Sequence, residues 1–143
     1  MARDMEQIEI EWDGPFTIEQ EVSKEHFGAV GLYIIEYNSC IIYIGKAETE
    51  GAHHRARNHF SGSTDRIGNR IRMNRGEKKL HIWVGIILEE RYRNLISTAE
   101  QLLIYKLQPT CNKNHRDEYK GEPSLILNKG HRPKELPKKI KSK

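Results

Sequence analysis

The sequence has no hydrophobic run long enough to cross a membrane and no segment patterned as a secretory signal. No stretch of its 143 residues approaches the roughly 20 apolar residues that a membrane-spanning helix needs. The first eleven residues carry alternating charges without an apolar core segment. Only two cysteines are present, Cys40 and Cys111, and they lack metal-ligand spacing. We therefore expect a cytoplasmic protein with reduced thiols and no membrane partner.

The sequence also lacks an internal repeat and a recognisable second domain, such as a helix-turn-helix or a zinc finger. Its length suits one domain with a core of ordinary size, which needs no disulfide staples. Any recognition of a partner must then be handled by this domain itself.

Positive charge is concentrated in the middle and at the C-terminal end of the chain. Residues 1–30 have a net charge of −6, residues 31–112 of +4 and residues 113–143 of +6. Basic segments suit a polyanionic partner, because neutralising phosphates supplies much of the affinity for nucleic acids. Charge alone is equally consistent with a solvated surface.

Two apolar runs with a short polar segment between them predict a hairpin of antiparallel strands at residues 30–37 and 40–44. A two-residue loop would place Tyr33 and Tyr43 on opposite faces, whereas a three-residue loop would pair them directly on one face. We favour the three-residue loop, because it separates apolar from mixed side chains and leaves a glycine beside each tyrosine accessible to a bulky ligand. It gathers six residues on the apolar face: Val30, Leu32, Ile34, Cys40, Ile42 and Ile44.

Periodicity predicts the remaining elements. The expected strands are Gln7–Trp12 and Leu80–Leu88, and the expected helices are Thr17–Ser23, Ala52–Phe60, Arg66–Arg75 and Tyr92–Leu107. The last helix must end before Pro109. Residues 138–143 are expected to be disordered. The predicted fold class is α/β (α+β), with a small central three-stranded antiparallel sheet flanked by helices.

Two polar constellations stand out within this pattern. Glu100 falls inside the broad apolar arc of the last helix, between Ile96 and Ile104. A carboxylate in such a position is normally paired or bound to a metal, so either a structural salt bridge or a metal ligand would explain it. Arg55 and His59 lie four residues apart and therefore on one face of a predicted helix.

With these residues in place, the sequence resembles the GIY-YIG nuclease superfamily over residues 30–112. Gly-Leu-Tyr at residues 31–33 matches the first motif with leucine in place of isoleucine, and Tyr-Ile-Gly at residues 43–45 matches the second motif unchanged. The flanks, an acidic extension at 1–29 and a basic tail at 113–143, have no counterpart in the family. Further matching positions are Lys46, Arg55, His59, Glu100 and Asn112.

The resemblance implies a divalent-metal-dependent DNA endonuclease that hydrolyses phosphodiester bonds. Glu100 would hold Mg²⁺ or Mn²⁺, which stabilises charge on the phosphate and the leaving oxygen. Arg55 would grip the scissile phosphate with its fork of donors. Asn112 would support the site from behind. A self-contained nuclease of this size is slightly more similar to restriction-type members than to structure-specific repair nucleases.

One tyrosine, Tyr43 or Tyr33, would orient or deprotonate the attacking water. Because an unperturbed tyrosine pKa is about 10, a neighbouring cation such as Lys46 or the metal must favour the phenolate. His59 would share the proton transfer or hydrogen-bond the phosphate.

The expected partner is DNA, contacted by arginines of the two predicted short helices. One active site cuts one strand, so double-strand cleavage needs a homodimer or two successive encounters. The contrasting hypothesis is a non-catalytic nucleic-acid-binding module, although the catalytic residue types are all present. The candidate DNA-binding residues are Arg57, Arg66, Arg70, Arg72 and Arg75.

Overall fold

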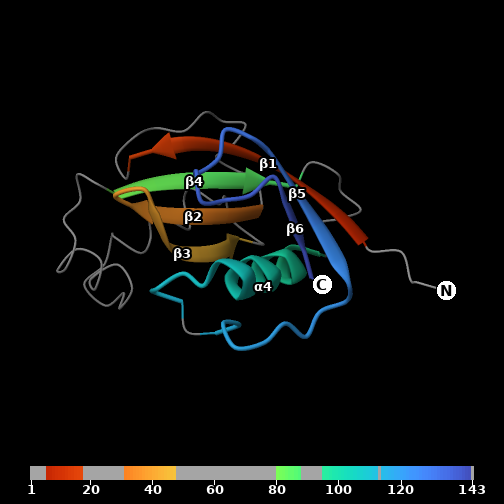
Figure 1. The fold of residues 1–143 in the computed structure, drawn as a ribbon. Coiled ribbons are helices and arrows are strands. Elements are labelled where there is room, and N and C mark those ends of the chain that lie inside the picture. The colour runs from red at the N-terminus through yellow and green to blue at the C-terminus, as the bar shows by residue number, and fades with distance from the viewer. Residues whose placement is uncertain (1–5, 18–30, 48–79, 88–94, 113, 143) are drawn as a thin grey trace.

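A mixed β-sheet organises the part of the chain that the structure, a computed structural model, describes: residues 6–17, 31–47, 80–87, 95–112 and 114–142. Within these residues the six strands follow the spatial order β3-β2-β4-β1-β5-β6, and all neighbours are antiparallel except β1 and β5. The strands are β1 (Glu6–Phe16), β2 (Gly31–Tyr37), β3 (Cys40–Ala47), β4 (Leu80–Ile86), β5 (Ser124–Gly130) and β6 (Lys139–Lys141). The helix α4 (Ile96–Leu107) packs chiefly against β3, at one edge of the sheet (Figure 1).

This architecture corrects the predicted fold class. The three strands predicted for the sheet form as β2, β3 and β4, but β1, β5 and β6 extend the same sheet to six strands. The sheet is larger than predicted because β1 pairs on both sides, with β4 on one and with β5 on the other. The predicted strand Gln7–Trp12 is therefore correct but too short. The helices predicted at residues 52–60 and 66–75 lie outside the described residues, as does all but Thr17 of the one at 17–23.

The basic tail is also more ordered than predicted. β6 pairs with β5, and its central residue Ile140 is buried between two exposed lysines. Leu136, in the connection from β5 to β6, is buried as well. These two apolar side chains anchor a segment whose charge predicts disorder, because their burial offsets the entropy lost when the backbone is fixed.

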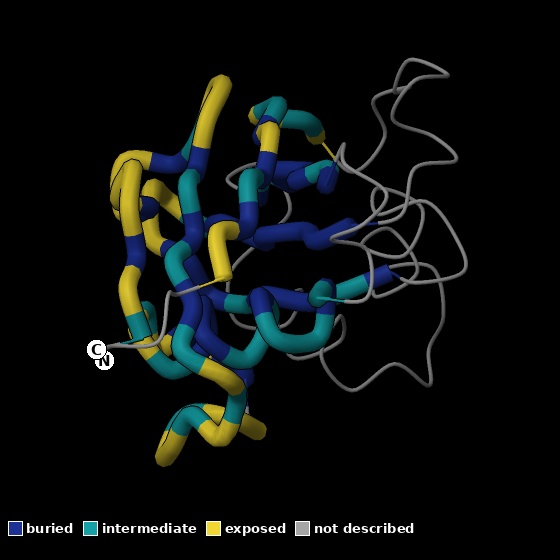
Figure 2. Tube along the Cα trace, turned by 90° about the vertical axis from the view of Figure 1, so that its right-hand side faces the viewer, coloured by how far each residue is buried: buried dark blue, intermediate teal, exposed yellow. Residues whose placement is uncertain are grey.

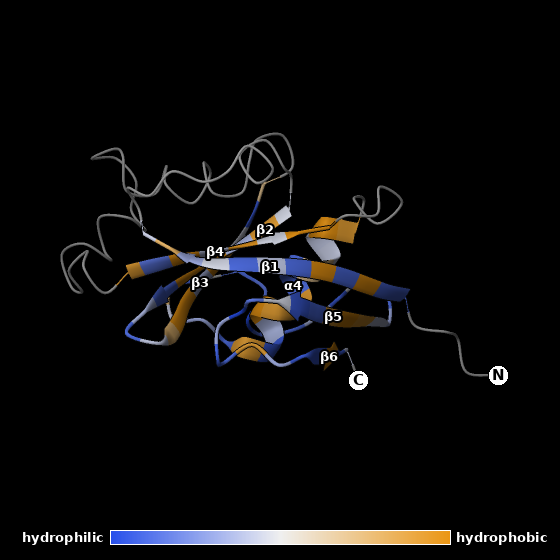
Figure 3. Ribbon diagram, turned by 90° about the horizontal axis from the view of Figure 1, so that it is seen from above, coloured by the Kyte–Doolittle hydropathy of each residue, from blue (hydrophilic) through white to orange (hydrophobic). Residues whose placement is uncertain are grey.

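The sheet has two apolar faces, and its centre is buried on both (Figure 2). We call the first the helix face, because there α4 packs against the sheet through Ile96, Ala99, Leu102 and Leu103. We call the second the tyrosine face. β1 shows the alternation of hydropathy expected of a strand with one face in the core (Figure 3). The tyrosine face carries Tyr33, Ile35, Ile42, Leu80, Ile82 and Val84, with Tyr43 packed against them.

The hairpin of β2 and β3 turns through two residues, not three. Asn38 and Ser39 have positive φ angles of 50° and 70°, as in the tight turns that match the twist of paired strands. After Glu36 pairs with Ile41, a β-bulge shifts the register, so that Ile35 pairs with Tyr43. The bulge leaves Ile42 as the extra residue.

This bulge reverses part of the predicted face assignment. Ile41 belongs to the helix face and Ile42 to the tyrosine face, the opposite of the expectation, and Cys40 is exposed. One extra residue in the strand affects side-chain alternation as one extra residue in the loop would. The prediction that Tyr33 and Tyr43 share a face is therefore confirmed, although their direct pairing is wrong.

Helix α4 ends where the sequence predicts, at Leu107. Gln108 adopts the left-handed conformation (φ 53°, ψ 54°), and its N–H donates to the carbonyl of Ile104 at 2.9 Å. Pro109 then prevents continuation. In the ranges that the structure describes, no helix has the length and apolarity needed to cross a membrane.

Candidate active site

Tyr33 and Tyr43 form the centre of the candidate site. They come from adjacent strands, β2 and β3, and their ring centroids lie 6.0 Å apart with an interplanar angle of 36°. In the register of the hairpin Tyr33 lies opposite Gly45 and Tyr43 opposite Ile35, so the two rings meet diagonally across the ladder. Tyr33 is only 1% exposed, whereas Tyr43 is half-buried.

The glycines beside the tyrosines serve packing within the protein. The ring of Tyr33 lies across Gly45, so that a Cβ added there would collide with Cζ and the hydroxyl oxygen of the ring. A Cβ at Gly31 would collide with the backbone carbonyl of Gly85 on β4. The prediction that these positions stay open for a bulky ligand is therefore wrong. Gly45 instead allows the Tyr33 hydroxyl to reach across β3, the edge strand of the sheet.

Lys46 follows Gly45 and contacts α4, on the other side of the same strand. Its Nζ donates a hydrogen bond to Oγ of Ser97 at 2.6 Å, and Ser97 belongs to the first turn of the helix. The N-terminal end of a helix carries partial positive charge, so an ammonium group there adds to a positive potential rather than cancelling it. This end of the sheet is consequently suited to an anion such as a phosphate.

Glu100 lies one helical turn after Ser97, so the two residues are neighbours along the surface of α4. The predicted arc is confirmed, because Ile96 and Ile104 on either side of Glu100 are buried while Glu100 itself is half-buried. Glu100 is thus a half-buried carboxylate, and carboxylate oxygens are the ligands that hard cations such as Mg²⁺ take.

Glu100 could serve only a Mg²⁺ or Mn²⁺ ion whose remaining ligands are waters and substrate phosphates. Among the described residues there is no group of three or more His, Cys, Asp or Glu side chains that would hold a metal. Mg²⁺ sites of phosphate-handling enzymes commonly use one or two carboxylates and complete the shell with waters and substrate phosphates. Glu100 suits that type of site.

Asn112 completes the edge of β3. Its Oδ1 accepts from the N–H of Ile44 and its Nδ2 donates to the carbonyl of Ile44, each at 2.9 Å, as a paired strand would do. The N–H of Cys111 donates to the carbonyl of Ile42 at 2.7 Å. Asn112 thus holds the backbone of β3, the strand that bears Tyr43 and Lys46. The predicted support of the site by Asn112 would act through these two hydrogen bonds.

We expect Asn112→Ala to lower the free energy of unfolding by about 2–4 kcal/mol, because two buried hydrogen bonds disappear and both backbone groups of Ile44 are left without their partner. Chemical denaturation measures this difference. Asn114→Ala is the matched control, since Asn114 is exposed, and it should change stability by less than about 0.5 kcal/mol. Equal effects of the two substitutions would contradict the role of Asn112.

Several predicted site residues lie outside the described residues. They are Arg55, Arg57, His59, Arg66, Arg70, Arg72 and Arg75. The structure therefore brings together the two tyrosines on one face of β3 and Lys46 with α4 on the other. Ser97 is the residue that sequence reasoning missed. The signal that could have found it is its position three residues before Glu100, on a neighbouring part of the helix surface.

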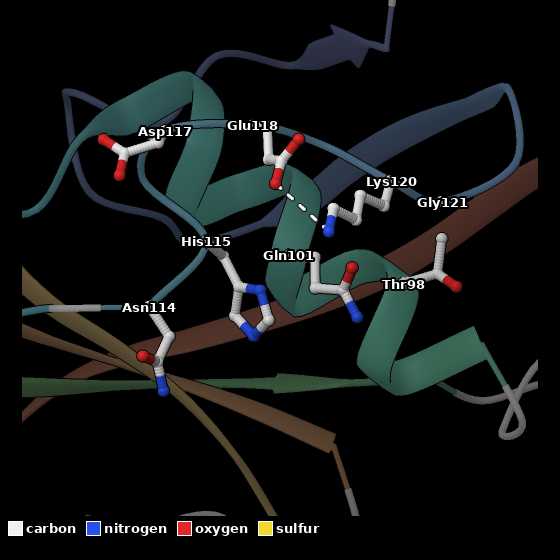
Figure 4. A pocket seen from close by; sticks show the side chains of 8 residues that line it. All are labelled: Thr98, Gln101, Asn114, His115, Asp117, Glu118, Lys120 and Gly121. Atoms are coloured by element: carbon white, nitrogen blue, oxygen red, sulfur yellow. Dashed lines mark ion pairs between the residues drawn. The ribbon is translucent and has the colours of Figure 1, made fainter.

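A polar hollow of about 700 Å³ lies on the far side of α4 and contains none of the predicted site residues (Figure 4). Thr98 and Gln101 line it from the helix, and Glu118 and Lys120 form an ion pair of 3.2 Å on the opposing segment. It is thus separate from the candidate active site at β3.

Comparison with known proteins finds no match to a protein-family model, a curated protein or a solved structure.

Proposed function

We propose that the protein is a divalent-metal-dependent endonuclease that hydrolyses phosphodiester bonds in DNA through a GIY-YIG-type active site. The observation that carries the proposal is the composition of β3 between residues 43 and 46. Within these four residues the strand presents a tyrosine packed beside Tyr33 on one face. On its other side it presents a lysine bound to the helix that bears Glu100.

The edge of the sheet is where phosphate would bind. Lys46 and the N-terminal turn of α4 both favour negative charge there. Arg55, which the family pattern assigns to the scissile phosphate, would add a bidentate contact. A bound Mg²⁺ or Mn²⁺, held by Glu100, would stabilise charge on the phosphate and the leaving oxygen.

Tyr43 is the better candidate for contact with the attacking water. It is half-buried, whereas Tyr33 is almost fully buried and lies across Gly45. Lys46 lies on the opposite face of β3 from Tyr43, so its proposed role is to bind the phosphate and not to favour the phenolate of Tyr43. Tyr33 then orients the neighbouring ring and the edge of the strand, and His59 remains the proposed partner in proton transfer.

Two free cysteines support a cytoplasmic setting for this activity, since Cys40 is exposed and unbridged. Restriction-type cleavage is our preferred role, with structure-specific repair as the alternative. Cleavage of both strands would require a homodimer or two encounters.

Supercoiled plasmid provides the test. We expect the protein with Mg²⁺ or Mn²⁺ to nick or linearise the plasmid, and we expect EDTA to abolish cutting, because the metal supplies several kcal/mol of charge stabilisation. Agarose gels separate the three plasmid forms, and discrete fragments would indicate sequence specificity. Tight binding of DNA without cutting under any divalent metal would favour the non-catalytic binding module instead.

A further inference from the structure

The C-terminal part of the chain forms an ordered, strongly cationic unit. We call residues 124–142 the basic hairpin: β5, β6 and the connection between them. From residue 127 onward it contains one carboxylate, Glu135, and that group is bound to another strand. Its Oε1 accepts a hydrogen bond of 2.6 Å from the N–H of Ile41 on β3. The described cations of this stretch are Lys129, Arg132, Lys134, Lys138, Lys139 and Lys141.

Four of these cations border one hollow, whose lining surface is almost wholly apolar, so their charged groups lie around it. It has a volume of about 390 Å³ and is lined by Lys129, Arg132, Lys138 and Lys139 with Leu127 and Asn128. Lys129 pairs with Glu9 at 3.3 Å, but both side chains are about half exposed, so this ion pair is weak. Within the described part of the chain, no ion pair involves the other three cations. The surface around the hollow therefore has a surplus of positive charge.

Hydrogen bonds hold the cations on a fixed backbone. Asn128 donates to the carbonyl of Lys138 from its N–H and to that of Pro137 from Nδ2, each at 2.8 Å. Arg132 Nε donates to the carbonyl of Leu136 at 3.1 Å. Because the backbone is already ordered, an anion that binds here does not have to order it, and the cost of binding is lower than on a disordered tail.

Protection of an edge strand accounts for only part of this charge. Lysines on an exposed edge prevent strands of different molecules from pairing, which suits Lys139 and Lys141 on β6. Arg132 and Lys138 lie outside β6, yet they line the same hollow. Edge protection therefore does not account for the cations that lie outside β6.

We propose that the basic hairpin binds the phosphodiester backbone of duplex DNA, with phosphates bound by the exposed cations that border the hollow between β5 and β6. The choice of DNA rests on the proposed nuclease function. The hydrogen bond between Glu135 and Ile41 ties the hairpin to β3, the strand that bears Tyr43 and Lys46. The hairpin is therefore a second binding surface for the substrate, attached to the strand that bears the candidate active site, and it contributes position rather than sequence information.

Binding of a labelled duplex in EDTA, measured by fluorescence anisotropy against salt concentration, tests the hairpin without requiring catalysis. The variant K138Q/K139Q removes two cations of the hollow. We expect at least roughly tenfold weaker binding at low salt and a fall of about 1.8 in the slope of log K against log salt, near 0.9 for each phosphate that is no longer neutralised. Both side chains are exposed, so the fold should be unaffected.

K106Q/K120Q is the matched control. It removes the same charge from exposed positions away from the hairpin and should leave the slope nearly unchanged. Equal slopes for the two variants would overturn the proposal, and so would tighter binding of polyglutamate than of duplex at equal salt, which would indicate an acidic protein partner. Hairpin-dependent binding without cutting would support this inference while the nuclease proposal fails, and cutting without hairpin-dependent binding would do the reverse.

Discussion

Glu100→Gln is expected to reduce plasmid cleavage at least about a hundredfold while duplex binding in EDTA stays within about twofold of the wild type. The amide keeps the size of the side chain and removes the charge that would hold the cation, and loss of several kcal/mol of charge stabilisation slows the reaction by a factor of ten for each 1.36 kcal/mol. Initial rates of nicking at saturating Mg²⁺ measure the effect. The free energy of unfolding should change by no more than about 1 kcal/mol.

Exchanging the residues at positions 100 and 101 gives a control variant with the same amino-acid composition as the wild type. Gln101 follows Glu100 on α4 and lines the hollow on the far side of the helix. The double variant E100Q/Q101E keeps the net charge but turns the carboxylate by about 100° around the helix axis. We expect it to be as inactive as E100Q. If instead E100Q cuts normally and only unfolds more easily, Glu100 is part of a structural ion pair and has no role as a metal ligand.

Gly45→Ala is expected to lower the free energy of unfolding by about 1–3 kcal/mol and to abolish most of the cleavage. The added methyl group would occupy the space of the Tyr33 ring. Tyr33 is 1% exposed and so has little freedom to move aside. Overpacking of this kind forces side chains off their rotamers or shifts the backbone, and here the shift would fall between Tyr43 and Lys46. Denaturant titration and plasmid nicking measure the two effects.

The Tyr33→Ala background tests the cause. Without the ring, the same Gly45→Ala change should cost at least about 1 kcal/mol less, because residues in contact are energetically coupled. Equal costs in both backgrounds would show that Gly45 is needed for another reason. Cleavage should not return in the double variant, since Tyr33 is part of the proposed site.

Local patterns predicted the elements that depend on neighbours in sequence. The β2–β3 hairpin, the strand from Leu80 and the end of α4 before Pro109 all follow from alternation, turn residues and proline geometry. The bulge at Ile42 could not be predicted from local patterns, because one extra strand residue and one extra loop residue give the same alternation of side chains.

Long-range pairing explains what the sequence could not predict. β5 lies parallel to β1, more than a hundred residues earlier, and β6 has one apolar residue, Ile140, among lysines. Periodicity over three residues carries too little information to identify such a strand. At the candidate site, composition and spacing identified the tyrosines and Glu100. The placement of the Tyr33 ring over Gly45 depends on the register of β2 against β3, so the sequence could not predict it.

The bonded edge of β3 restricts how two copies of the protein could associate. Backbone groups of Ile41, Ile42 and Ile44 on this edge are already bonded to Glu135, Cys111 and Asn112. Two molecules therefore cannot join their sheets through these groups without breaking native bonds. The opposite edge, β6, presents lysines that repel a second copy. Two copies that cut both strands of a duplex would have to contact each other through side chains of other surfaces, and the DNA would bring the two protein molecules together.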